Sequence, residues 1–279
     1  MLATPNHHHK ASRTTMLKQK VRLIFGYLLF ALLALMNSHN SLAEGKTLKI
    51  STGEYPPWTG EALPEQGYVN HIVREAFAAV GIQVEFIYMP WKRAFEEAKK
   101  GKVDATSYWF NNSERSASML LSEPLIQNRT VFFQRMEDPP IEWKTLDDLA
   151  DYRISATVGF SYTEAFLKAI AERRLNATLV PSDVQNIKML MSGRVELIAT
   201  DEMSGFYMAA TLSVDPRKLR VLDPPMVTDK GYLMATKSKS ESTDLINEFN
   251  RGLKIIRENG VYQQILNRID NSSFYSPEV

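Results

Sequence analysis

Hydrophobic and polar positions alternate along the chain in a way that predicts short strands followed by amphipathic helices. A strand is expected at residues 47–51. Apolar residues then recur at helical spacing from Val69 to Val80, and Gly81 ends this helix. A strand at residues 84–89 and a helix beginning at Trp91 follow in the same order. Such alternation is typical of a mostly parallel sheet with helices on its faces.

The alternation continues with a strand at residues 103–107 and starts again in the second half of the chain. Thr145 and Asp148 have the spacing of a capping box that opens a short helix. Further strands are expected at residues 153–157, 177–180 and 195–200, and further helices at residues 162–173 and 184–191. Residues 101–105 and 193–197 both run glycine, basic residue, valine, acidic residue, apolar residue. This weak echo suits two similar α/β lobes.

Two extended segments, residues 130–135 and 221–230, are expected to carry the chain between the lobes. Residues 44–134 and 228–279 then form the first lobe, and residues 135–227 form the second. Each lobe should hold its own mostly parallel sheet flanked by helices, and one continuous sheet would argue against the division. Ligands of open α/β sheets bind outside the carboxyl ends of the strands, so a site is expected in the crevice between the lobes.

The N-terminal part of the chain has the pattern of a secretory signal peptide. Residues 21–36 are apolar except for Arg22, basic residues precede them, and Ser41 and Ala43 suit a cleavage site. A membrane anchor is the alternative, but the apolar run is shorter than the ~20 residues of a membrane-spanning helix. Residues 1–43 are therefore assigned to an upstream extension and a cleaved signal peptide. Translation could begin at Met1 or at Met16.

Composition excludes several classes of function. Removal of residues 1–43 leaves 28 basic and 32 acidic residues, a net charge near −4, which argues against nucleic acid and anionic lipid as partners. The chain has no cysteine, and His71 is the only histidine after residue 43. Histidine-based triads, cysteine nucleophiles and histidine-rich zinc sites are thus poorly supported. We expect a monomer that is not an enzyme, with no metal and no cofactor.

Several short motifs occur in a characteristic order. They are EYPPWTG at residues 54–60, GKVDA at 101–105, SER at 113–115, LSEP at 121–124, GFSY at 159–162 and NGVY at 259–262. Together they resemble the bacterial extracellular solute-binding proteins of family 3, over about residues 46–270. The resemblance implies a two-lobed periplasmic-binding-protein fold of type II and a periplasmic location. It also implies a small polar ligand, an amino acid, that is delivered to an ABC transporter permease in the inner membrane.

The resemblance assigns roles to two charged residues on opposite lobes. Arg115 stands in a polar turn, and its planar guanidinium can hold a carboxylate through two hydrogen bonds. Asp201 follows the strand at 195–200, where a carboxylate can pair with the ammonium group of an amino acid. The alternatives are a solvated surface arginine and an N-cap for the next helix. A zwitterion bound by both residues would favour closure of the lobes.

The remaining ligand contacts implied by the resemblance are a hydroxyl and several aromatic rings. Ser161 matches a hydroxyl residue that bonds the ligand carboxylate, although an ordinary N-cap is the alternative. Tyr55 and Trp91 match aromatic walls around the ligand side chain, and Trp58 is a further aromatic candidate. For Trp91, core packing is an equal alternative.

One segment departs from the family pattern. Residues 108–112, which include Tyr108 and Trp109, are aromatic where family members carry serine and threonine. Both rings are expected either to line the pocket or to pack in the core. A more apolar or unusual amino acid is one consequence of pocket-lining rings at these positions.

Two other functions suit the same fold. Periplasmic dehydratases resemble it and use a carboxylate as a general acid, for which Glu164 and Glu202 are the candidates. A ligand-sensing protein that docks on a membrane receptor is the other possibility, and the sequence does not separate it from a transport protein.

Overall fold

The computed structural model describes residues 47–270 of the 279-residue chain. The predicted signal peptide and upstream extension lie outside the described residues. Within residues 47–270, no helix combines the length and the apolar character that crossing a membrane requires.

The first group of elements, here called lobe I, begins with a parallel three-stranded unit. Strands β1 (Thr47–Thr52), β2 (Gln83–Tyr88) and β3 (Ala105–Phe110) run in the order β2-β1-β3. The other elements of lobe I are η1 (Pro64–Gln66), α2 (Tyr68–Ala78), α3 (Trp91–Lys99), α4 (Ser113–Ser118), β4 (Met119–Leu121), α8 (Ser242–Glu258) and α9 (Val261–Asp270).

The second group, lobe II, repeats this parallel arrangement. Strands β6 (Ile154–Thr157), β7 (Ala177–Val180) and β8 (Leu197–Asp201) run in the order β7-β6-β8. The other elements of lobe II are η2 (Leu146–Leu149), α5 (Glu164–Ala171), α6 (Asp183–Met191), α7 (Glu202–Thr211) and η3 (Pro216–Lys218). The capping box predicted at Thr145 and Asp148 is confirmed, since both of its hydrogen bonds are present.

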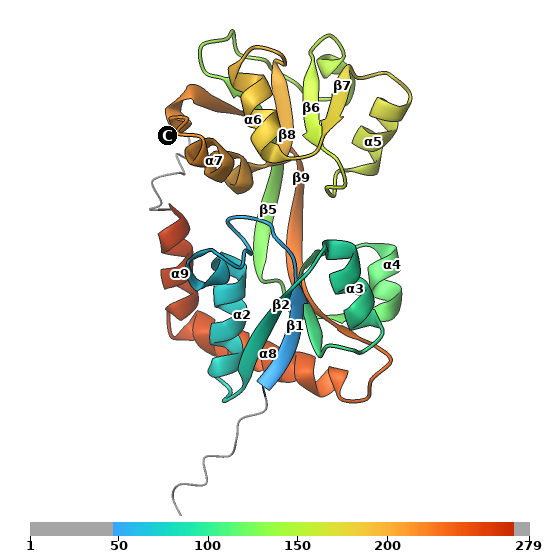
Figure 1. Cartoon of the computed structure of the whole chain (residues 1–279), viewed down its shortest axis with the longest axis vertical. Coiled ribbons are helices and arrows are strands. Elements are labelled where there is room, and N and C mark those ends of the chain that lie inside the picture. The colour runs from blue at the N-terminus through green and yellow to red at the C-terminus, as the bar shows by residue number, and fades with distance from the viewer. Residues whose placement is uncertain (1–46, 271–279) are drawn as a thin grey trace, which may run out of the picture. The chain divides into compact units, whose positions relative to one another are not determined.

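Two long antiparallel strands, β5 (Ile126–Arg135) and β9 (Leu219–Thr236), run between the two groups (Figure 1). At one end β9 pairs with β3 and β4, and at the other end β5 pairs with β8. Their mutual register shifts between Thr130 and Phe132. The expectation of two unconnected sheets is therefore wrong, because β5 and β9 pair along their length in both lobes and join the nine strands of residues 47–270 into one sheet.

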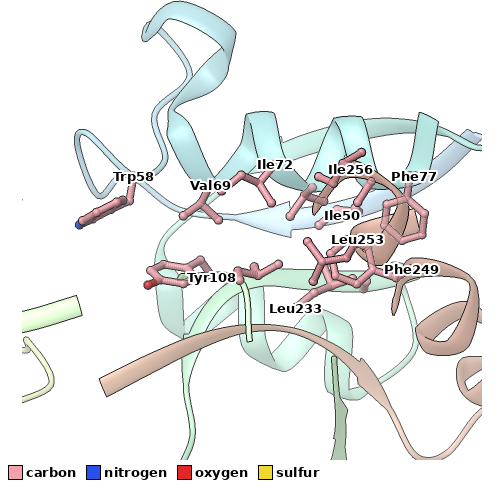
Figure 2. Close-up of a cluster of buried hydrophobic side chains, with 14 of the residues drawn as sticks. Ile50, Trp58, Val69, Ile72, Phe77, Tyr108, Leu233, Phe249, Leu253 and Ile256 are labelled. Atoms are coloured by element: carbon pink, nitrogen blue, oxygen red, sulfur yellow. The ribbon is translucent and has the colours of Figure 1, made fainter. Parts of the chain in front are cut away.

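The hydrophobic core is nevertheless divided between the lobes. The largest cluster packs α2 and α8 against β1 and β9, with the rings of Phe77 and Phe249 5.0 Å apart (Figure 2). Two separate clusters lie in lobe II, centred on Phe132 and on Phe133, whose side chains point to opposite faces of β5. The described residues thus form a two-lobed α/β fold, as the sequence predicts. The exact lobe boundaries, residues 44–134 with 228–279 and residues 135–227, stay a prediction.

Candidate ligand-binding site

A cavity of about 390 Å³ is lined by residues of both lobes. Seven of the eight predicted site residues line it: Tyr55, Trp91, Tyr108, Trp109, Arg115, Ser161 and Asp201. The eighth, Trp58, does not line the cavity but bonds Asp201 directly. The sequence motifs therefore lead to one place in the fold, although the roles assigned to these residues stay predictions.

Arg115 lies on a short helix rather than in the predicted turn. The side chain of Asn112 caps α4 by accepting a hydrogen bond from the backbone N–H of Arg115 at 2.8 Å. The guanidinium donates through Nη1 to the carbonyl of Phe110 at 2.6 Å and lies 5.0 Å from the ring centre of Trp109. Within residues 47–270, no carboxylate lies at ion-pair distance from it. Its orientation is fixed while most of its N–H groups stay open to an anion.

Asp201 ends β8 and is almost completely buried, with 3% of its surface exposed. Its Oδ1 accepts from the backbone N–H of Ser204 at 2.9 Å and from Trp58 Nε1 at 2.8 Å, and its Oδ2 accepts from Asn128 Nδ2 at 2.9 Å. Burial raises the pKa of Asp201, and these hydrogen bonds oppose the rise. The N-cap alternative is confirmed, because the side chain caps α7. This role leaves the ligand role open.

The phenol of Tyr108 contacts the same carboxylate indirectly, through Asn128. Its hydroxyl donates to Oδ1 of Asn128, the residue whose amide bonds Asp201. Gly231 makes room for the ring, since a Cβ atom there would lie 1.5 Å from Tyr108 Cε2. Burial raises the pKa of Tyr108 well above its ordinary value, so the phenol keeps its proton. Tyr108 thus lines the cavity and packs in the core, which combines both expected roles.

A cluster of aromatic rings forms another wall of the cavity. Trp109 meets Trp91 and Phe95 edge to face, with ring centres 5.1 and 5.3 Å apart. Trp91 donates through Nε1 to the carbonyl of Glu54 at 3.2 Å, and its ring lies directly on Gly53, where a Cβ would be 2.6 Å from Cε2. These contacts hold the two indoles in place, so this wall of the cavity is preformed.

Ser161 is exposed and lies in the loop before α5. The expected N-cap alternative for Ser161 is wrong, because Thr163 caps the helix by accepting from the backbone N–H of Phe166 at 3.2 Å. The loop also places Phe160 edge-on to Tyr55, with ring centres 5.9 Å apart, which brings rings from the two lobes together.

Nine lining residues were not predicted from the sequence. They are Lys92, Phe95, Glu96, Phe110, Glu114, Thr130, Gly159, Phe160 and Tyr162. Helical spacing from Trp91 could have indicated Phe95, which lies four residues later on the same face of α3. Most of the others are chain neighbours of predicted residues, such as Phe110 after Trp109 and Phe160 before Ser161, and the same motifs could have indicated them. The sequence also contains no signal that Trp58 and Asn128 would donate to the carboxylate of Asp201, or that the hydroxyl of Tyr108 would donate to Asn128.

The carboxylates named for the enzyme alternative lie outside this cavity. Glu164 is exposed in the first turn of α5. Glu202 forms an ion pair with Arg129 at 2.9 Å. Neither residue lines the cavity. The described residues also hold no group of three or more histidine, cysteine, aspartate or glutamate side chains arranged to bind a metal.

Comparison with known proteins assigns this chain to a family. The family model described as bacterial extracellular solute-binding proteins, family 3, matches residues 48–269. A search of curated protein sequences finds no relative.

Three solved structures with the same fold come from different kinds of protein. The GluR0 ligand-binding core from Nostoc punctiforme in complex with L-glutamate has a TM-score of 0.63 at 18% identity, covering 81% of this chain and 100% of its own. A substrate-binding protein of an amino acid ABC transporter has a TM-score of 0.61 at 16% identity, covering 81% and 100%. A histidine kinase sensor domain similar to periplasmic binding proteins has a TM-score of 0.63 at 20% identity, covering 81% and 97%.

Proposed function

The chain belongs to the bacterial extracellular solute-binding proteins of family 3, and from that premise we propose that it captures an amino acid in the cavity between its lobes. Arg115 of lobe I holds the α-carboxylate, and Asp201 of lobe II accepts the α-ammonium group. Tyr55, Trp91, Tyr108 and Trp109 surround the ligand side chain, and Ser161 adds a hydroxyl to the carboxylate.

One observation carries this proposal: a guanidinium and a carboxylate from different lobes line the same cavity. A charge-assisted bidentate pair at Arg115 favours a carboxylate. Within residues 47–270, none of the hydrogen-bond partners of Asp201 is a cationic side chain, so a cation from outside can supply the opposite charge. A zwitterion satisfies both groups at once, and only when the lobes are together. Ligand binding therefore favours closure.

The captured amino acid is then handed to an ABC permease. Support comes from the extracellular family and from the fold shared with an amino acid ABC transporter component. A sensory role is the second candidate, because the same fold occurs in a histidine kinase sensor domain. Deletion of the gene separates the two. Loss of uptake of the bound amino acid supports transport, whereas normal uptake with a lost transcriptional response supports sensing.

Export through a cleaved signal peptide completes the proposal. When the full chain is produced in a Gram-negative host, the soluble periplasmic product should begin at Glu44, as intact-mass measurement would show. A product that keeps residues 21–36 and stays in the membrane fraction would contradict this part of the proposal without affecting the ligand site.

The experiment that tests the binding function uses the purified chain beginning at Glu44. Each of the twenty amino acids is added in turn while the unfolding temperature is followed, and mass spectrometry identifies any small molecule that copurifies. A subset of amino acids should raise the unfolding temperature, because a ligand of the native state stabilises it by mass action. Each should be recovered chemically unchanged. No stabilisation by any amino acid would refute the proposal, and conversion of a bound compound would favour the dehydratase-like alternative.

A further inference from the structure

We propose that Trp58 is a positioning residue for ligand recognition: its indole N–H crosses from lobe I to Asp201 in lobe II and leaves Oδ2 as the oxygen presented to the ligand ammonium group. The inference rests on the proposed function of Asp201. It assigns to Trp58 a role different from the aromatic ligand contact that the sequence predicts.

The indole of Trp58 is anchored in lobe I. The residue is 3% exposed and belongs to the same core cluster as Val69 and Ile72. Its backbone N–H donates to the carbonyl of Tyr55 at 2.8 Å, and its carbonyl accepts from Val69 N–H at 2.9 Å. Figure 2 shows the indole nitrogen at the end of the side chain that points out of the cluster, on the same side as the hydroxyl of Tyr108. Packing in lobe I therefore fixes the direction of the indole N–H, the single hydrogen-bond donor of this side chain.

The hydrogen bonds around Asp201 leave little freedom to its carboxylate. An ionised carboxylate offers about four acceptor positions. Trp58 Nε1 and Ser204 N–H occupy two positions on Oδ1, and Asn128 Nδ2 occupies one on Oδ2. Since Tyr108 holds the carbonyl of Asn128, the amide must turn its NH₂ group toward Asp201. The fourth position, on Oδ2, is the one left for a ligand.

The donor comes from the opposite lobe, which ties the orientation of Asp201 to contact between the lobes. A second hydrogen bond joins the same two segments, because Ser204 Oγ donates to the carbonyl of Pro56 at 2.8 Å. Without the indole N–H, Oδ1 loses the hydrogen bond that comes from the opposite lobe, and the carboxylate is held less firmly in its buried site. Loss of this bond should weaken recognition of an ammonium group more than recognition of a carboxylate at Arg115.

The first test needs no ligand and uses the indole N–H resonances of the ¹⁵N-labelled protein. Trp58→Phe identifies the signal of Trp58. Asp201→Asn, which keeps a good N-cap residue, should shift that signal upfield because an amide oxygen is a weaker acceptor than a carboxylate. Trp143 supplies the control, since its buried Nε1 has no hydrogen-bond partner in the described chain. Its signal should stay in place. An unmoved Trp58 signal would overturn the proposal.

The second test compares ligands with and without the ammonium group. The amino acid that stabilises the wild-type protein most is paired with the carboxylic acid that lacks only its amino group. Trp58→Phe should weaken binding of the amino acid about tenfold and binding of the deaminated acid less than twofold. Trp143→Phe should change neither affinity. Equal weakening of both ligands would show a merely structural role for Trp58. If no amino acid stabilises the wild-type protein, the proposed function fails, and the resonance test alone decides whether Trp58 positions Asp201.

Discussion

Replacement of Arg115 by alanine separates ligand binding from folding most sharply. Among the described residues, the side chain makes one hydrogen bond, to the carbonyl of Phe110, and one contact with the face of Trp109. A hydrogen bond from a charged donor contributes about 1.5 kcal/mol and a partly exposed cation–π contact about 0.5–1 kcal/mol, so folding should lose about 2 kcal/mol. The net stability of a folded protein is about 5–15 kcal/mol, which exceeds this loss, so Arg115→Ala should fold.

The loss in binding should be larger. Two charge-assisted hydrogen bonds to a ligand carboxylate contribute about 3 kcal/mol or more, which is at least a hundredfold in affinity. At a ligand concentration of about 100 times the wild-type Kd, the wild type gains about 2.7 kcal/mol of stability. At the same concentration the variant gains about 0.4 kcal/mol. With about 2–4 °C per kcal/mol, the thermal shift should fall from about 5–11 °C to about 1 °C.

The assay is thermal unfolding with and without the amino acid that stabilises the wild type most. Arg217→Ala is the matched control, because Arg217 is an exposed arginine that pairs with Asp215 away from the cavity. The control should keep the full shift. A shift in Arg115→Ala within about 2 °C of the wild type, at equal ligand concentration, would refute the role of this guanidinium.

Three further predictions follow from single contacts. Gly231→Ala should lower the free energy of unfolding, measured in urea, by about 1–3 kcal/mol and should weaken ligand binding, because the new Cβ collides with Tyr108 and displaces its hydroxyl from Asn128. Unchanged ligand affinity would show that the phenol of Tyr108 has no role in binding. The free energy of unfolding of Asp201→Asn, relative to that of the wild type, should increase as pH rises. Burial raises the pKa of Asp201, so the wild type has the full contribution of this group below the ordinary aspartate pKa and loses it as pH rises through the folded-state pKa. Urea unfolding between pH 4 and pH 8 checks the sign, and a difference that shrinks with rising pH would contradict it. Glu164→Gln should leave ligand affinity unchanged within twofold, since the side chain is exposed outside the cavity, and a titration with the same amino acid tests this.

The sequence predicts the order of elements because local periodicity dominates in them. The strand at residues 177–180 is confirmed as β7, and the first amphipathic helix matches α2 within a few residues. The strand predicted at residues 103–107 is wrong at both ends, since β3 covers Ala105–Phe110. Its later residues pair with β9, and Tyr232 and Gly231 supply that pairing from more than a hundred residues away. Local pattern alone could not extend the strand to Phe110.

In the site too, residues that belong to short local motifs could be predicted, and contacts between distant parts of the chain could not. Motifs identify Arg115 and Asp201, because each depends on a short run of sequence beside a strand or helix end. They do not identify Asn128, whose amide meets a carboxylate 73 positions later. Asn128 lies in the polar first half of β5, between Gln127 and Arg129, so nothing in the local pattern sets it apart. The indole of Trp58 is similar, since its bond to Asp201 spans 143 positions.

Arg115 and Asp201 are held in different ways, and the difference suggests an order of events for the proposed function. Both contacts that fix Arg115, to Phe110 and Trp109, come from lobe I. Asp201 instead depends on Trp58 of lobe I as well as on its own helix α7. The arginine therefore keeps both contacts whether or not the lobes touch, whereas Asp201 gains the hydrogen bond from Trp58 only when they do and keeps the one from Ser204 in either case. A zwitterion would accordingly engage its carboxylate first, and its ammonium group would select the closed arrangement afterwards.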